Sequence, residues 1–155
     1  MQVATRAPLP SDVDAANLLR ASEYAAFLQA SGLDRVRPEA RLECSRLGRY
    51  DELLAHVVGH RYFLGLERGE EVSIEEAAAS WYDNVYMPVV RAIRRHGLLT
   101  RLRGWTETDL YVEVTRRWLQ LSEAGAEADP HQAVHKVMLE PARRWWRRRR
   151  ALQVG

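Results

Sequence analysis

A chain of 155 residues with 46% hydrophobic and 28% charged residues has the size and composition of one globular domain. No apolar run approaches the roughly 20 residues that cross a bilayer, and the first residues lack the apolar segment of a secretory signal. The single cysteine, Cys44, excludes an internal disulfide and a cysteine-based zinc site. Together these features predict a protein of the reducing cytoplasm.

The first half of the chain predicts two helices. Residues 1–10 contain two prolines and read as a flexible arm, after which Ser11 begins a helical pattern that Gly32 ends. Residues 33–48 are expected to be irregular, although Arg41–Cys44 has the pattern of a short strand without a partner strand. The second helix runs from about Tyr50 to Gly69. The apolar positions expected to be buried in the two helices are Leu18, Leu19, Tyr24, Phe27 and Leu28, and then Leu53, Leu54, Val57, Val58 and Leu64.

The second half of the chain continues with helices that begin at capping boxes. Ser73 with Glu76, and Thr106 with Asp109, have the spacing in which each residue satisfies a free backbone donor of the other. Gly97 and Gly125 are expected to end these two helices. Pro88 lies inside the first of them and predicts a kink, because proline cannot donate to the Asn84 carbonyl.

The last helix is predicted to begin with Asp129 as its N-cap and Pro130 at its first position. Pro141 interrupts it, and a basic segment follows. The sequence therefore predicts an all-α fold of about five helices in a compact orthogonal or bundle arrangement. Its parts are the arm (1–10), a helical domain (11–128), and a C-terminal helix with a basic tail (129–155).

One helix face carries a candidate metal site. Glu52, His56 and His60 are spaced four residues apart, and His at i and i+4 is a spacing that zinc sites use. The two residues after His56 are valines, so the face has no HExxH motif. Packing of the two imidazoles at the edge of the apolar stripe is the competing interpretation. His131 and His135 repeat the spacing.

The segment Ser80–Tyr86, SWYDNVY, is the most aromatic part of the chain. Trp81 and Val85 are expected in the core. Tyr82, Asp83 and Tyr86 are expected to be exposed and are the candidate residues for binding a protein partner.

The C-terminal segment is strongly basic. Residues 143–155 contain six arginines and no acid, whereas the rest of the chain has 17 basic and 21 acidic residues. Arginines neutralise phosphates, and tryptophans stack on bases or lie at lipid headgroups. Three interpretations are open: a nucleic-acid contact, an anionic membrane contact, or a helix whose tryptophans pack on the domain. The residues concerned, called the Arg/Trp tail below, are Arg143, Arg144, Trp145, Trp146, Arg147, Arg148, Arg149 and Arg150.

Residues 15–121 resemble one bacterial family. The similar stretches are ASEYAAFLQASGLDRVRP (21–38), GRYDELLAHVVGHRYFLGLERG (48–69), EEAAASWYDNVYMPVVRAI (75–93) and TETDLYVEV (106–114). They are similar to the helical region that follows the ParB-like domain in proteins labelled as transcriptional regulators of undefined function. The ParB-like domain itself is absent here, and the tail lies outside the resemblance. The resemblance implies an accessory module of a DNA-handling protein.

Taken together, the sequence favours a non-enzymatic cytoplasmic binding module without a cofactor. It would bind a protein partner or a second copy of itself, with a polyanion contact through the tail. The alternatives are a metal-dependent enzyme that uses Glu52, His56 and His60, and a peripheral membrane protein anchored by the tail.

The tail hypothesis predicts steep salt dependence. Each phosphate contact contributes about −0.9 to the slope of log affinity against log salt for duplex DNA, so four to six contacts give a slope of about −4 to −5. Deletion of residues 142–155 should remove this binding and leave the helical body folded. Titrations with duplex DNA, single-stranded DNA and anionic vesicles at two salt concentrations measure it. Absence of binding to all three at low salt would refute the polyanion role.

Overall fold

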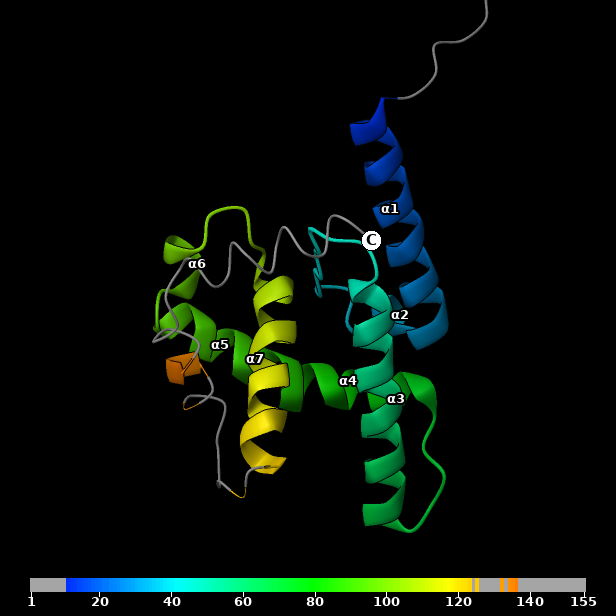
Figure 1. Cartoon of the computed structure of the whole chain (residues 1–155). Coiled ribbons are helices and arrows are strands. Elements are labelled where there is room, and N and C mark those ends of the chain that lie inside the picture. The colour runs from blue at the N-terminus through cyan, green and yellow to red at the C-terminus, as the bar shows by residue number, and fades with distance from the viewer. Residues whose placement is uncertain (1–10, 124, 126–131, 133, 137–155) are drawn as a thin grey trace, which may run out of the picture.

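All secondary structure in the described part of the chain is helical, as the sequence predicts. The computed structural model describes residues 11–123, 125, 132 and 134–136. Within them, seven α-helices and one π-helical turn follow one another (Figure 1). Their bounds are α1 Asp12–Ser31, α2 Leu33–Val36, α3 Arg49–Arg68, α4 Ile74–Trp81, η1 Tyr82–Tyr86, α5 Met87–Arg95, α6 Leu98–Arg101 and α7 Glu107–Glu123.

Local capping explains where the long helices begin and end. Ser11 and Asp14 form a complete capping box at the start of α1, and Thr106 and Asp109 form another at the start of α7. At Ser73 only half of the predicted box is present: the hydroxyl accepts from the Glu76 N–H at 3.2 Å, whereas the Glu76 carboxylate pairs with Arg68.

Gly32 and Gly69 end their helices as the sequence predicts. Their φ angles are 66° and 69°, and each N–H donates to the carbonyl four residues back. A Cβ at Gly32 would also lie 2.6 Å from Glu75 Cγ, so that side chain would have to shift to admit any other residue.

The elements α4, η1 and α5 form one continuous rod across the molecule (Figure 1). Pro88 lies within it and cannot donate to the Asn84 carbonyl, which its ring also crowds. The five residues before Met87 widen into a π-helical turn, and the Met87 N–H bonds to the Tyr82 carbonyl. The disruption predicted at Pro88 is thus a π turn within a helix that continues to Arg95.

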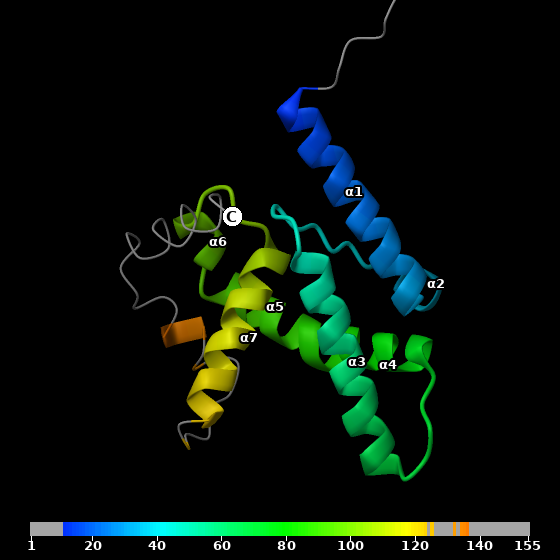
Figure 2. The same cartoon turned by 45° about the vertical axis from the view of Figure 1, so that its right-hand side comes forward.

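Two helices cross this rod side by side. Helix α3 packs on α4, helix α7 packs on α5, and α1 packs against α3 (Figures 1 and 2). The core lies at the crossing, where Trp81, Tyr86 and Tyr111 are in mutual aromatic contact, with ring centroids 4.9 to 5.8 Å apart. Trp81 is fully buried, which confirms its predicted place in the core.

Several expectations about burial and local structure are wrong. Leu18, Leu19 and Val58 are 65%, 54% and 51% exposed, because the helix faces on which they lie are not covered by another described element. Residues 33–48, expected to be irregular, contain the short helix α2. Arg41–Cys44 does not form a strand, in keeping with the lack of a partner strand in the sequence. The sequence also gave no indication of α6, a single turn.

The predicted C-terminal helix is described only in part. Residues 132 and 134–136 are helical, and Val134 is fully buried in the core cluster. The remainder, including His131, Pro141 and the Arg/Trp tail, lies outside the described residues.

Candidate functional site

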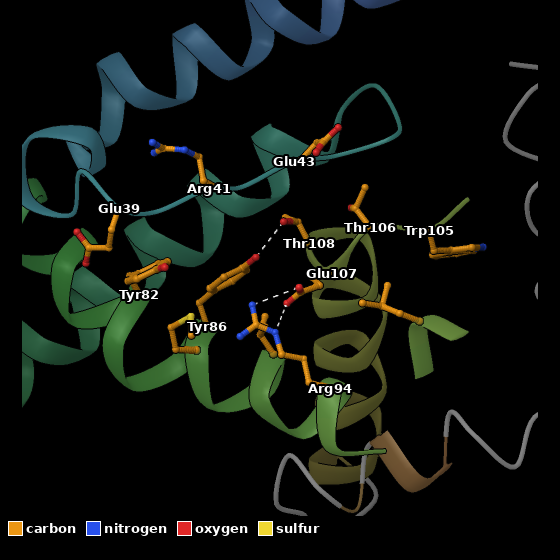
Figure 3. Close-up of a pocket in the computed structure, with 13 residues that line it drawn as sticks. Glu39, Arg41, Glu43, Tyr82, Tyr86, Arg94, Trp105, Thr106, Glu107 and Thr108 are labelled. Carbon is orange, nitrogen blue, oxygen red and sulfur yellow. Dashed lines mark hydrogen bonds and ion pairs between the residues drawn. The ribbon is translucent and has the colours of Figure 1, made fainter. Parts of the chain in front are cut away.

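A cavity of about 550 Å³ opens between three parts of the fold (Figure 3). The segment with Glu39, Arg41 and Glu43 forms one side, the face of η1 and α5 forms the second, and the residues leading into α7 form the third. We call this cavity the groove, and we call residues 39–45, which form its first side, the groove segment. Its lining mixes aromatic, acidic and basic side chains, which suits recognition of a polar chain more than capture of a small apolar ligand.

Tyr82 and Tyr86 line the groove from the π turn, stacked with ring centroids 5.5 Å apart. Tyr86 is only 3% exposed and its hydroxyl lies 2.9 Å from Thr108 Oγ1, so the expectation that it is exposed is wrong. Burial raises the pKa of both phenols, so they are neutral hydrogen-bonding groups at physiological pH. Tyr82 is half-buried and is the member of the pair that a ligand can reach.

Asp83 is exposed, as expected, but its carboxylate is engaged. It forms a bidentate pair with the Arg37 guanidinium, with Nε 2.9 Å from Oδ1. This hydrogen bond is the main cause that lowers the pKa of Asp83. The pair fastens the chain just before the groove segment to the π turn, so Asp83 positions the groove and does not line it.

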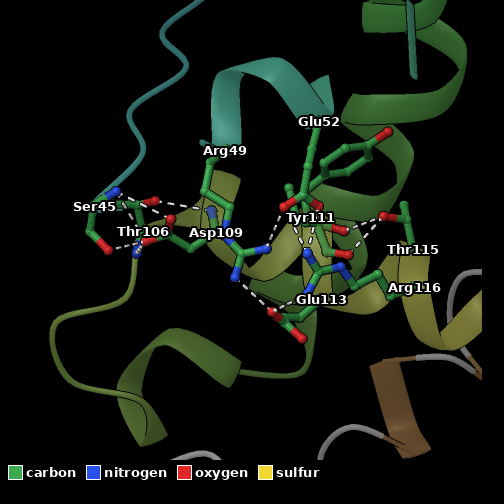
Figure 4. A network of polar contacts seen from close by, with 10 residues as sticks. Ser45, Arg49, Glu52, Thr106, Asp109, Tyr111, Glu113, Thr115 and Arg116 are labelled. Atoms are coloured by element: carbon green, nitrogen blue, oxygen red, sulfur yellow. Dashed lines mark hydrogen bonds and ion pairs between the residues drawn. The ribbon is translucent and has the colours of Figure 1, made fainter. Parts of the chain in front are cut away.

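A buried polar network fixes the other end of the groove segment (Figure 4). The carboxylate of Asp109, which is fully buried, accepts from the Ser45 N–H at 3.2 Å, the Ser45 hydroxyl at 2.5 Å and the Thr106 N–H at 3.1 Å. Next to it, Arg49 donates to Glu113 at 2.7 Å, with both side chains buried. The loop and α3 are thereby tied to α7.

The residues of the candidate metal site do not converge. Glu52 pairs with Arg116 at 2.7 Å, His56 bonds to the Tyr111 hydroxyl at 2.9 Å, and His60 bonds to the Ser80 hydroxyl at 2.9 Å. Within the described part of the chain, no three His, Cys, Asp or Glu side chains are grouped to hold a metal ion. Each of these three side chains therefore has a partner on another element, and the imidazoles pack at the edge of the core.

His56 ends a chain of buried hydrogen bonds. The Trp81 indole N–H donates to the Tyr111 hydroxyl at 3.0 Å, and that hydroxyl lies 2.9 Å from His56 Nδ1. Since indole is only a donor, the Tyr111 proton is free to point at His56, which must then be neutral and accept at Nδ1. Burial lowers the pKa of His56, with Glu52 opposing the shift and Arg116 adding to it.

Cys44 is unsuited to nucleophilic chemistry. It is 4% exposed, and burial, reinforced by the nearby Asp109, raises the pKa of its thiol to about 12. The thiolate, which is the reactive form, is therefore scarce at neutral pH.

Helix α3 presents an uncovered apolar surface on its outer side. Every exposed residue between positions 55 and 66 is apolar: Ala55, Val58, Tyr62, Phe63 and Leu66. We call this set the α3 face. The four large side chains are 51% to 68% exposed. The sequence did not indicate this surface, because Val58 continues the predicted buried stripe and the exposure of Tyr62, Phe63 and Leu66 depends on which side of α3 the rest of the fold covers.

Comparison of the chain with protein-family models, curated proteins and solved structures finds no match. The resemblance to the ParB-associated region thus stays a prediction. None of the helices that the structure describes is long and apolar enough to cross a membrane.

The buried state of His56 predicts a loss of stability in mild acid. Its folded pKa lies below the ordinary value of 6.5, so below about pH 6.5 the unfolded chain binds more protons than the folded chain. The free energy of unfolding should therefore fall as pH drops from 7.5 to 5.5. Denaturant titrations at several pH values should show a shallower fall for His56→Asn, whose amide oxygen takes the position of Nδ1 and accepts from Tyr111. His135→Asn, at an exposed position, is the matched control. An identical fall in wild type and His56→Asn would contradict the assignment.

Proposed function

We propose that the chain is a non-enzymatic binding module that associates through the α3 face, with a second copy of the chain as the occupant. The observation that carries the proposal is that all exposed residues between Ala55 and Leu66 are apolar, while the one charged residue of the stretch, Arg61, is held toward the loop before α4. Eleven residue steps at 1.5 Å give a length of about 16 Å. Contiguous exposed apolar surfaces on soluble proteins mark interaction sites.

The polar side chains of the same stretch are turned away from this surface. His56 and His60 bond inward to Tyr111 and Ser80. Arg61 donates to the Val72 carbonyl at 2.6 Å, on the side of the loop before α4. The apolar character of the face therefore follows from how α3 is held by the core.

Gly59 supports a close-packed helical partner. It lies in the middle of α3, where glycine costs roughly 1 kcal/mol relative to alanine. A Cβ built at this position meets no atom of another described element within 4 Å, so none of the described residues requires glycine there. A second helix crossing at this point would use the space, because small residues let helix backbones approach closely.

A second copy matches the α3 face in chemistry and in shape. In a two-fold pair the same surface is used by both partners, so one apolar face covers the other. An antiparallel pair of α3 helices would bury Val58, Tyr62 and Leu66 from both copies, and the hydrophobic area removed from water would drive association.

Two other parts of the proposed function, the cellular location and the polyanion contact, rest on the sequence. We place the protein in the cytoplasm, which the free buried thiol of Cys44 supports. A polyanion contact through Arg143–Arg150 would suit an accessory module of a DNA-handling protein, the role that the ParB-associated resemblance implies.

The α3 face can be tested with the purified chain alone. Sedimentation equilibrium should show a dimer whose dissociation is reversible on dilution. The double variant Tyr62→Glu/Leu66→Glu should be monomeric with little change in melting temperature at low concentration, because both side chains are exposed. Val13→Glu/Leu19→Glu places the same charges at exposed apolar positions of α1 and should leave the dimer intact.

The variant Gly59→Leu distinguishes an effect on dimerisation from an effect on folding. It should keep or raise the stability of the monomer, because leucine is a better helix former and the space is open, yet it should weaken the dimer. A wild-type chain that stays monomeric at every concentration would refute self-association. Equal dissociation of the α1 control would place the interface elsewhere.

A further inference from the structure

The groove segment has the alternation of a β-strand without belonging to a sheet. Ala40, Leu42 and Cys44 are buried, whereas Arg41 and Glu43 are exposed and line the groove. This is the Arg41–Cys44 pattern that the sequence marks as a strand lacking a partner. The described residues contain no strand to pair with it.

One edge of the segment is already satisfied by a side chain. The Tyr50 hydroxyl donates to the Leu42 carbonyl at 2.9 Å and accepts from the Cys44 N–H at 3.1 Å. It thus bonds a carbonyl and the N–H two residues later, as a residue of a neighbouring strand does. This spacing suits an extended backbone, and the contact uses the edge on the side of α3.

The opposite edge is open. In an extended chain, the N–H and C=O groups of alternate residues point to opposite edges, so those of Arg41 and Glu43 face away from Tyr50. No described residue makes a hydrogen bond to the backbone N–H or C=O of Arg41 or Glu43. An exposed strand edge of this kind is a template for another extended chain.

We propose that this edge accepts an extended, basic peptide segment of a protein partner, which adds to it as a strand with its side chains over the groove. In this mode of recognition the main-chain hydrogen bonds give affinity and the pockets for alternate side chains give specificity. The site is separate from the α3 face, so the inference goes beyond the proposed self-association and does not depend on it.

The charges around the groove indicate that the bound peptide is positively charged. Among the described residues, the carboxylates of Glu39 and Glu43 form no ion pair or hydrogen bond. The Arg41 guanidinium is held by its own segment, donating to the Pro38 carbonyl at 2.8 Å and the Ala40 carbonyl at 3.0 Å. On the other wall, Arg94 and Glu107 neutralise each other at 2.8 Å (Figure 3). The edge therefore carries two carboxylates without an ion pair and one guanidinium, Arg41, whose charge remains, so its net charge is negative.

The edge is also held in one conformation before a peptide binds. Arg37 pairs with Asp83 at one end, Ser45 bonds to Asp109 at the other, and Tyr50 holds the middle. Because the segment is fixed before the peptide arrives, little conformational entropy is lost on the protein side. Tyr82, half-buried in the opposite wall, offers an aromatic surface to every second side chain of the peptide.

The probe is a capped heptapeptide of alternating valine and arginine, titrated into the full chain by calorimetry at low salt. Only every second residue of an added strand forms main-chain hydrogen bonds to the edge. In the probe these residues are the arginines, because their side chains then lie on the same face as Glu43. N-methylation of the arginines should therefore abolish binding, whereas N-methylation of the valines should leave it nearly unchanged. Both peptides keep the same charge and side chains.

Variants of the protein test the charge. Glu39→Gln/Glu43→Gln should weaken binding by about tenfold, since two opposite-charge cross-strand pairs are lost. Glu70→Gln, an exposed acid in the loop before α4, should have no effect. The Tyr62→Glu/Leu66→Glu variant should bind the peptide normally, so failure of the α3 face would not affect this result.

Absence of binding by the unmodified peptide, or equal binding by the two methylated peptides, would overturn the proposal. Equal binding by wild type and Glu39→Gln/Glu43→Gln would overturn the preference for a basic partner.

Discussion

The buried hydroxyl of Tyr111 is the contact on which the arrangement of the described helices depends. It accepts from the Trp81 indole on the rod and bonds to His56 on α3, while its own backbone belongs to α7. An unpaired donor at this depth would cost about 1–3 kcal/mol, so the three helices must meet with these groups in register. The aromatic contacts of Trp81, Tyr86 and Tyr111 fill the space around it.

The contacts at this crossing determine the position of both surfaces that we assign to binding. Fixing α3 by His56, and by His60 one turn later, turns the polar side of the helix inward and leaves Val58, Tyr62 and Leu66 outward. Fixing α7 against α5 brings Asp109 within reach of Ser45, and this contact anchors the groove segment beside the π turn. The molecule thus presents a rigid apolar surface and a rigid polar groove, each formed by residues that the core has already positioned.

The sequence predicted best the features that are set by residues close together in the chain, such as the starts and ends of helices. The helix starts at Ser11 and Thr106 and the ends at Gly32 and Gly69 follow from local hydrogen bonds and glycine conformation, and they are confirmed. The sequence could not show which apolar residues are covered. Val58 continues the stripe of α3 but is left exposed by the other described elements, and Tyr86 is buried because α7 passes over it.

Contacts between distant residues were likewise beyond the sequence. Asp109 was recognised as a helix cap, but its bond to Ser45 joins residues 64 positions apart. The Glu52–His56–His60 spacing was correctly identified as one helix face, yet each side chain finds a partner on another element. The alternation in Arg41–Cys44 corresponds to alternating burial, and the group that bonds to its backbone is a tyrosine hydroxyl instead of a strand.

The central claim, that two copies meet through the α3 face, is tested most directly by a distance between them. Cys44 is 4% exposed, so a cysteine introduced at the exposed position Glu67 is the thiol that a spin label will reach. In an antiparallel pair centred near Gly59, the two labels would be separated by about 20–25 Å along the helix axis. Pulsed dipolar spectroscopy at high protein concentration should therefore show a defined coupling in this range. Absence of any coupling between copies would contradict the account.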